Sequence, residues 1–145
     1  MDKCFICERI DLIKKNRNPY FVKELETGFV VLGDFQYYPG YTLFLSKIHV
    51  NELHQLEFDF MKEFLEEMAQ VAKAVYFAFK PAKINYEMLG NEYPHLHWHI
   101  FPRYKDDPNF KSPVWMIDKS IRCSESVKIT SEELESMKKK LLNFL

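Results

Sequence analysis

Between residues 21 and 46, short apolar runs alternate with residues that favour turns. This pattern predicts three strands, at 21–25, 29–32 and 41–46, because each run is bounded by residues such as Gly, Pro and Asp. A tight turn at 26–28 joins the first two strands. The pattern therefore predicts that the second strand folds back along the first.

The apolar period lengthens to three or four residues over the next part of the chain. It runs from Leu56 to Phe79, with lysine and glutamate on the opposite face, and predicts one long amphipathic helix that stops near Pro81. The apolar stripe of this helix is expected to belong to the core. Two further strands are predicted at 83–88 and 96–101.

The last part of the chain divides into a loop and a helix. Residues 105–120 contain two prolines and are expected to form a loop, whereas Thr130 and Glu133 form a capping box that predicts a closing helix. This order of elements predicts an α+β fold, an antiparallel sheet with one long central helix and a C-terminal helix. We expect a single domain, 1–145, in which 104–145 is a C-terminal extension packed on it.

Composition narrows the classes of function. The chain of 145 residues has 20 Lys+Arg, 21 Asp+Glu and a formal net charge of −1, which excludes a generically basic nucleic-acid binder and a polybasic membrane surface. No apolar run approaches the roughly 20 residues that span a bilayer, and the start at Met1 lacks the apolar core of a signal peptide. Three cysteines, an odd number, argue against a disulfide framework. We expect a cytoplasmic protein without a nucleic-acid or membrane partner.

Three of the five histidines fall within His95-Leu96-His97-Trp98-His99. Alternate side chains of a strand share a face, so the three imidazoles are expected to point one way, about 6.6–6.8 Å apart. Two interpretations follow from the residues alone. Histidines at i and i+2 can chelate a catalytic metal. Alternatively, one imidazole, substantially neutral near pH 7, acts as a nucleophile, while its neighbours position it and protonate the leaving group.

The segment 95–101 resembles the signature of the histidine-triad (HIT) superfamily, His-φ-His-φ-His-φ-φ with φ apolar. Two further stretches are similar to this family, in the same order along the chain. Residues 39–50, Pro-Gly-Tyr-Thr-Leu-Phe-Leu-Ser-Lys-Ile-His-Val, resemble its Pro-Gly-His-x-Leu strand and Pro-Lys-x-His-like turn. Cys4-Phe5-Ile6-Cys7 resembles the opening of its zinc-carrying members. Pro102-Arg103 is more similar to the branches that cleave dinucleoside polyphosphates than to the Hint branch, which favours glycines at these positions.

The resemblance implies a nucleotide hydrolase or nucleotidyl transferase that cleaves adenine dinucleoside polyphosphates, such as diadenosine tetraphosphate, at the α-phosphate. His97 would attack the α-phosphorus and form a covalent nucleotidyl-histidine intermediate. His99 would hydrogen-bond the phosphate and the leaving-group oxygen, and His95 would support this network. The alternatives are a purine nucleoside phosphoramidase of the same superfamily, a metal-dependent hydrolase with the histidines as ligands, and a non-catalytic nucleotide-binding module. The family is commonly homodimeric, and Mg²⁺ could accompany the nucleotide.

The resemblance also implies a set of substrate-binding residues. The amide of Asn91 would contact phosphate, and Asp34 would accept a hydrogen bond from the ribose. Two residues near the start of the chain, Phe5 and Ile6, would line the base pocket. The implied set is Asn91, Asn85, Asp34, Leu32, Phe35, Phe5 and Ile6. The chain departs from the family pattern at Tyr41, where histidine is usual, and at Ser46, where proline is usual. The aromatic residues Tyr37, Tyr38 and Trp115 are expected to serve packing rather than substrate stacking.

The pair Cys4-x-x-Cys7 has three interpretations: two metal ligands, a redox pair or two reduced thiols. A tetrahedral zinc site needs two more ligands. In the zinc-bearing relatives these are the histidine after the Pro-Lys-like turn and the first histidine of the triad, which are His49 and His95 here. The resemblance therefore implies a structural zinc ion held by Cys4, Cys7, His49 and His95. His54 matches no family position and is expected to be a surface residue.

Overall fold

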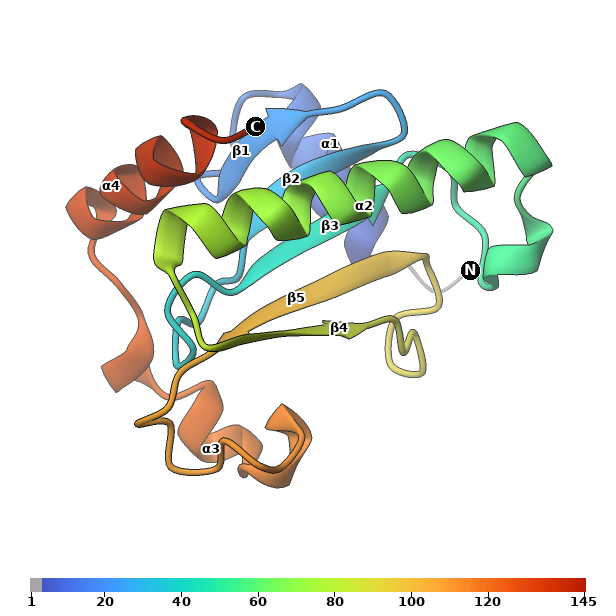
Figure 1. The fold of residues 1–145 in the computed structure, drawn as a ribbon. Coiled ribbons are helices and arrows are strands. Elements are labelled where there is room, and N and C mark those ends of the chain that lie inside the picture. Colours follow the sequence, from blue (N-terminus) through green and yellow to red (C-terminus); the bar gives the residue numbers. More distant parts are fainter. Residues whose placement is uncertain (1–3) are drawn as a thin grey trace.

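A five-stranded antiparallel sheet with helices on both faces forms the frame of the protein (Figure 1). The structure is a computed structural model and describes residues 4–145, so the start at Met1 lies outside it. The strand order is β1-β2-β3-β5-β4. The bounds are Phe21–Glu24 for β1, Gly28–Leu32 for β2, Thr42–Ser46 for β3, Lys83–Glu87 for β4 and His97–Arg103 for β5.

Within residues 4–145, four α-helices and three short 3₁₀ turns accompany the sheet. The helices are α1 (Phe5–Lys14), α2 (Phe58–Phe79), α3 (Lys119–Arg122) and α4 (Ser131–Leu142). The 3₁₀ turns are η1 (Leu53–Gln55), η2 (Val114–Met116) and η3 (Glu125–Val127). These elements confirm the predicted α+β fold with its long central helix and its C-terminal helix. None of the helices within residues 4–145 is both long and apolar enough to cross a membrane.

The long helix α2 covers one face of the sheet, as Figure 1 shows. Its Phe64, Val71 and Val75 are fully buried against Phe44 of β3 and Ile100 of β5. The three- and four-residue spacing that predicts the helix is therefore the spacing of its buried face. This burial holds β3 and β5 under the helix and leaves the opposite face of β5 free for the histidines.

A buried carboxylate ties α2 to the first hairpin. Glu67 accepts hydrogen bonds from the backbone N–H groups of Glu26 and Thr27, both at 2.8 Å, and from the Thr27 hydroxyl. Glu67 is 8% exposed, and these donors compensate its burial. The turn predicted at 26–28 is thereby fixed to the helix.

The first helix, α1, lies on the other face of the sheet and was not predicted from the sequence (Figure 1). Its Ile6, Ile10 and Ile13 are buried together with Val31 of β2 and Leu45 of β3. The spacing of four and three residues between these isoleucines is helical, and it is the signal that could have revealed the helix. Because α1 covers only one side of this face, the face remains open over β5.

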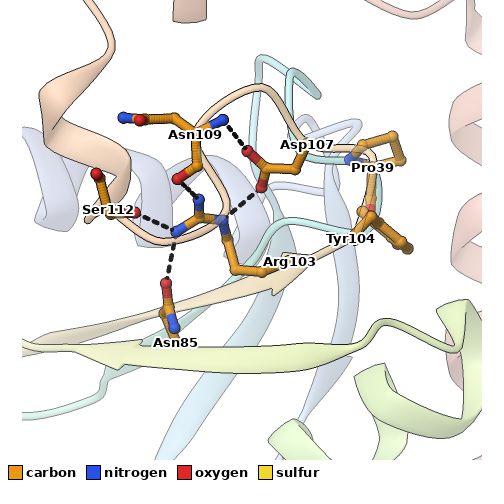
Figure 2. Close-up of polar contacts among 7 residues, drawn as sticks. All are labelled: Pro39, Asn85, Arg103, Tyr104, Asp107, Asn109 and Ser112. Carbon is orange, nitrogen blue, oxygen red and sulfur yellow. Dashed lines mark hydrogen bonds and ion pairs between the residues drawn. The ribbon is translucent and has the colours of Figure 1, made fainter.

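A buried arginine organises the chain after β5. The guanidinium of Arg103 donates to the Asp107 carboxylate at 2.6 Å and to the Asn85 side-chain oxygen at 2.8 Å. It also donates to the carbonyls of Ser112 at 2.8 Å and Asn109 at 2.7 Å, so the chain closes around it (Figure 2). Arg103 is 1% exposed. We call these contacts the Arg103 clasp.

The segment predicted as a loop at 105–120 contains local structure that the sequence pattern did not reveal. After the clasp, Val114 is fully buried against Tyr38 and Phe101, and η2 and α3 follow. The predicted capping box is present at the start of α4, where Thr130 and Glu133 exchange side-chain-to-backbone hydrogen bonds. The division into a domain and a packed extension at 104 stays a prediction.

Candidate active site

A cavity of about 490 Å³ opens on the face of the sheet opposite α2. Its size falls in the range of small-molecule sites. Of the predicted residues, it is lined by His97 and His99 of β5, by Asn91, and by Phe5, Ile6, Asp34 and Phe35. We call Phe5, Ile6 and Arg9 of α1 the N-terminal wall, and Trp115, Lys119, Arg122 and Cys123 the C-terminal wall.

The ring of His97 has a defined tautomer. Its Nδ1 lies 2.6 Å from the backbone carbonyl oxygen of His95. A carbonyl can only accept, so Nδ1 carries the hydrogen and Nε2 keeps its lone pair. His97 is 4% exposed, and burial lowers its pKa below the ordinary value despite the hydrogen bond to His95. The ring is therefore a neutral imidazole with a nucleophilic nitrogen beside the cavity.

His99 lies two residues further along β5, with its ring centroid 4.8 Å from that of His97. Its Nδ1 is 2.6 Å from the hydroxyl oxygen of Tyr41. Burial raises the pKa of Tyr41, so the phenol keeps its proton, and its hydroxyl has no other hydrogen-bond partner within residues 4–145. Donation to Nδ1 satisfies this hydroxyl and places the hydrogen of His99 on Nε2.

The charge of His99 is set by its surroundings. Burial, with a smaller electrostatic contribution from the neighbouring His97 and Arg122, lowers the pKa of His99 to about 3. A neutral Nε2–H can donate a hydrogen bond to a phosphate or leaving-group oxygen, but it carries no positive charge near pH 7. The edge of the ring faces Trp115, with centroids 5.4 Å apart.

Gly33 leaves space for the ring of Tyr41. A Cβ at Gly33 would lie inside the van der Waals envelope of that ring. The ring is stacked on Phe101 at a centroid distance of 4.1 Å and cannot retreat without losing this contact. The departure from the family pattern at position 41 is thus accommodated by glycine at position 33.

His95 does not share the cavity with the other two histidines. The strand β5 begins only at His97, and His95 lies in the bend before it, so the expectation that all three rings point one way is wrong. Its Nε2 lies 2.9 Å from the Ser46 carbonyl oxygen and therefore carries the hydrogen. Its Nδ1, with a lone pair, lies 3.5 Å from Cys4 Sγ and 3.4 Å from Cys7 Sγ.

Four predicted metal ligands converge at this point. Cys4, Cys7, His49 and His95 each offer one ligand atom, and all four atoms lie within 4.8 Å of one another. The Cys7 sulfur is 3.1 Å from His49 Nδ1. Bond lengths of about 2.3 Å for sulfur and 2.0–2.1 Å for nitrogen imply S···N separations of about 3.5–3.6 Å around a tetrahedral ion. The donor set and its spacing therefore fit zinc.

The thiol of Cys7 is protonated in the absence of a metal. Burial, and then hydrogen bonding to Cys4, raise the pKa of Cys7 to about 11. Such a thiol is protonated at neutral pH, and a bound divalent metal would displace the proton and use the thiolate as a ligand. His54, expected at the surface, is exposed and lies outside the cluster.

Two predicted substrate-binding residues do not line the cavity. Leu32 is fully buried in the core under α2, because alternation along β2 turns Val31 and Gly33, not Leu32, toward the cavity. Asn85 lies on β4, where its side-chain oxygen accepts from Arg103 (Figure 2). The resemblance identified segments that border the cavity, but it did not predict the direction in which the side chains of Leu32 and Asn85 point.

Several cavity residues were missed by the sequence reasoning. Arg9 forms an ion pair with the Asp34 carboxylate, and its guanidinium carbon lies 5.4 Å from the centroid of the Phe5 ring. Trp115, expected to serve packing, lines the cavity beside His99. Lys119 and Arg122 had no motif to mark them. Their position in the cavity depends on the path of the chain after the Arg103 clasp, which the sequence does not reveal.

Comparison with known proteins identifies a family for this chain. The HIT domain family matches residues 15–106, which is more than half of the chain. The chain belongs to the HIT domain family. Members of this family are generally nucleotide-binding proteins that act as nucleotide hydrolases or transferases, although some are non-catalytic.

Individual relatives are distant. The chain is 28% identical over 81 residues to Protein hit of Bacillus subtilis, over 52% of this chain and 55% of that protein. The match thus spans about half the length of that curated relative. A histidine triad protein from Sinorhizobium meliloti has a similar fold, with a TM-score of 0.77, 22% identity, and coverage of 90% of this chain and 94% of its own.

A further solved structure supports the same fold. It is a hypothetical histidine triad nucleotide-binding protein from Sulfolobus tokodaii, with a TM-score of 0.71 and 22% identity. The similarity covers 94% of this chain and 90% of that one. At these identities, the likeness to both solved structures shows the fold of this HIT-domain protein.

Proposed function

We propose that this HIT-domain protein hydrolyses adenine dinucleoside polyphosphates at the α-phosphate through a covalent nucleotidyl-histidine intermediate. The observation that carries the proposal is the 2.6 Å contact from His97 Nδ1 to the His95 carbonyl. It leaves Nε2 of a buried, neutral imidazole as the nucleophile. The name of the Sulfolobus relative, a histidine triad nucleotide-binding protein, is consistent with a nucleotide as the ligand.

The first step forms a bond between His97 Nε2 and the α-phosphorus. The bond from that phosphorus to the leaving-group oxygen breaks, and its electron pair stays on the oxygen. The Nε2–H of His99, fixed by Tyr41, donates a hydrogen bond to this oxygen or to the phosphate. In the second step a water oxygen displaces Nε2, which regains its lone pair, and the water releases a proton as AMP forms.

The nucleoside would occupy the end of the cavity next to the N-terminal wall. Phe5 and Ile6 offer an apolar surface for the base, and Asp34 offers a carboxylate for the ribose, although one of its oxygens is held by Arg9. Asn91, exposed on the β4–β5 connection, would reach the phosphates, and Mg²⁺ could accompany them. These assignments place the base and the reacting phosphorus on opposite sides of the ribose.

Zinc at the Cys4, Cys7, His49 and His95 cluster would be structural. Bound there, the ion would fix the start of α1 and the ring of His95. The backbone carbonyl of the same His95 holds the hydrogen of His97. The cluster thus positions the nucleophile without contacting the substrate.

A homodimer remains part of the proposal. The edge strands of the sheet are β1 and β4, and α2 exposes Phe58, Tyr76 and Phe77. An exposed edge or apolar face of this kind suits a second copy of the chain. Size-exclusion chromatography with light scattering would test this, and a monomer at all concentrations would contradict it.

The proposed reaction is tested by intact-protein mass spectrometry after rapid mixing with diadenosine tetraphosphate. We expect an acid-labile adduct of one AMP on the wild type and none on His97→Ala. Product formation without an adduct, stopped by chelators, would instead favour a metal-dependent hydrolase. Faster turnover of adenosine 5′-phosphoramidate than of the tetraphosphate would favour a phosphoramidase, and nucleotide binding without turnover would identify a non-catalytic module.

A further inference from the structure

The C-terminal wall places a positive charge near the triad. Arg122 lines the cavity and is partly buried. Its Nε–H donates to the Ile117 carbonyl at 2.9 Å, and its guanidinium carbon lies 4.8 Å from the centroid of the Trp115 ring. An arginine has five N–H donors. The four donors on the two terminal nitrogens of Arg122 have no protein partner within residues 4–145.

The ring of Trp115, over which Arg122 lies, is held next to β5, the strand that carries His97 and His99. The indole N–H of Trp115 donates to the Glu87 carboxylate at 2.6 Å. Glu87 is paired with His99 across β4 and β5, and the Trp115 ring packs against the His99 ring. Arg122 is therefore held at a set position relative to His99, the histidine assigned to the leaving-group side.

The charge of Arg122 is not neutralised by an ion pair within the described part of the chain. Its acidic neighbours are engaged elsewhere, Glu87 by Trp115 and Asp118 by the backbone and hydroxyl of Ser120. The other cation of this wall, Lys119, pairs with Glu92 at 3.4 Å, and both of those side chains are well exposed. A partly buried guanidinium that forms no ion pair within residues 4–145 is suited to an anion that enters the cavity.

We propose that Arg122 is a specificity-determining residue that binds the phosphates of the leaving group and selects nucleotide anhydrides over nucleotides with an amine leaving group. This rests on the proposed function, in which the nucleoside lies against the N-terminal wall and the α-phosphorus over His97. The chain of phosphates beyond the α-phosphorus then passes His99 toward Arg122. When the α-phosphorus–oxygen bond breaks, the electron pair stays on the β-phosphate oxygen, whose negative charge Arg122 stabilises.

The test compares two substrates with different leaving groups. The values of kcat/KM for diadenosine tetraphosphate and adenosine 5′-phosphoramidate are measured for the wild type, Arg122→Gln, Arg122→Lys and, as a matched control, Arg17→Gln. Arg17 is exposed and does not line the cavity. We expect kcat/KM for diadenosine tetraphosphate, divided by kcat/KM for the phosphoramidate, to fall about 10- to 100-fold in Arg122→Gln, because a hydrogen-bonded charge pair is lost. It should fall less in Arg122→Lys and stay unchanged in Arg17→Gln.

Equilibrium binding separates this proposal from the proposed hydrolysis. The affinities for AMP and ATP are measured in His97→Ala with Arg122 intact and with Arg122→Gln added. We expect ATP to bind about tenfold more tightly than AMP, and Arg122→Gln to remove this difference. If the difference appears and is removed while the wild type cleaves neither substrate, the role of Arg122 stands and the proposed hydrolysis falls.

Two results would overturn the role of Arg122. One is an equal loss of kcat/KM for both substrates in Arg122→Gln, which would mean that Arg122 only supports Trp115. The other is an equal affinity for AMP and ATP while Arg122 is intact, whatever the turnover.

Discussion

The two walls of the cavity are held to the sheet by different means. The N-terminal wall belongs to α1, whose three buried isoleucines pack on β2 and β3 and whose start lies in the Cys/His cluster. In the C-terminal wall the segment 114–123 buries only Val114, and its position depends on the Arg103 clasp before it. One wall rests on apolar packing and a Cys/His cluster, and the other rests mainly on polar contacts, those of the Arg103 guanidinium and that of Trp115 with Glu87.

The two walls thus depend on two different sources of stability, apolar packing in one and buried polar contacts in the other. Apolar packing is spread over many contacts, so a single substitution in α1 removes only part of it. The clasp concentrates four partners on one group, so its loss leaves several buried polar atoms unsatisfied at once. The walls should therefore respond differently to substitution and to chelation.

The largest effect is expected from Arg103→Met. The Asp107 side chain is 4% exposed, and it would be left as an unpaired buried carboxylate. We expect a loss of about 3–5 kcal/mol in the free energy of unfolding, measured by urea denaturation. Proteolysis within 104–123 should become faster than proteolysis of α1.

A double variant serves as the control for the clasp. Arg103→Met combined with Asp107→Leu removes both charges, so part of the lost stability should return. A loss of less than about 1 kcal/mol in the single variant would show that the clasp does not hold the C-terminal wall.

The next effect concerns the proposed zinc site. Removal of zinc by a chelator, or Cys4→Ser with Cys7→Ser, should lower Tm by about 5–10 °C, since a tightly bound ion adds about 2.7 kcal/mol at 100 times its Kd. KM for the nucleotide should rise more than kcat falls, because α1 carries Phe5 and Ile6. His54→Ala, at an exposed histidine outside the cluster, should leave the metal content unchanged. Abolition of kcat without a change in Tm would contradict the structural role.

A smaller effect is expected from a change at Tyr41, which lines the cavity between the two walls. Tyr41→Phe keeps the ring stacked on Phe101 but removes the hydroxyl that fixes the tautomer of His99. We expect kcat to fall about tenfold, equivalent to about 1.4 kcal/mol, while KM changes less than about twofold. Tyr86→Phe, an exposed tyrosine on β4, is the matched control and should leave both values unchanged. A rise in KM with unchanged kcat would assign Tyr41 to binding instead.

The smallest effect is expected from Lys119→Gln. Its ion pair with Glu92 links the C-terminal wall to the β4–β5 connection, but both side chains are well exposed. Exposed pairs contribute about 0–1 kcal/mol, so the free energy of unfolding should change by less than about 0.5 kcal/mol in urea. A larger loss would mean that this pair, and not the clasp alone, holds the wall.

The elements that bury one regular face were predictable from the sequence. The strands at 29–32 and 41–46 and the helix α2 lie within a few residues of their predicted bounds, because burial repeats with the period of the backbone. The capping box at Thr130 was predictable for a local reason, since its partner is three residues away. Local periodicity and local hydrogen bonds are visible in one sequence.

Features that depend on distant partners were not predictable. Arg103 bonds to Asn85, 18 residues earlier, and nothing in the local sequence marks the two residues as partners. The position of Trp115 beside His99 follows from that clasp and from Glu87. The facing of Leu32 was missed because a family motif fixes the order of residues along the chain but not the side of the strand on which each one lies.

The close fit of Gly33 against the Tyr41 ring has a consequence for how this sequence can change with time. A methyl group at position 33 is incompatible with the aromatic ring at position 41 in its present place. Gly33→Ala would be accepted only in a lineage that had already exchanged Tyr41 for a smaller residue, and such a lineage would have lost the hydroxyl partner of His99. The two positions therefore have a fixed order of substitution: residue 41 must become smaller before residue 33 can gain a side chain.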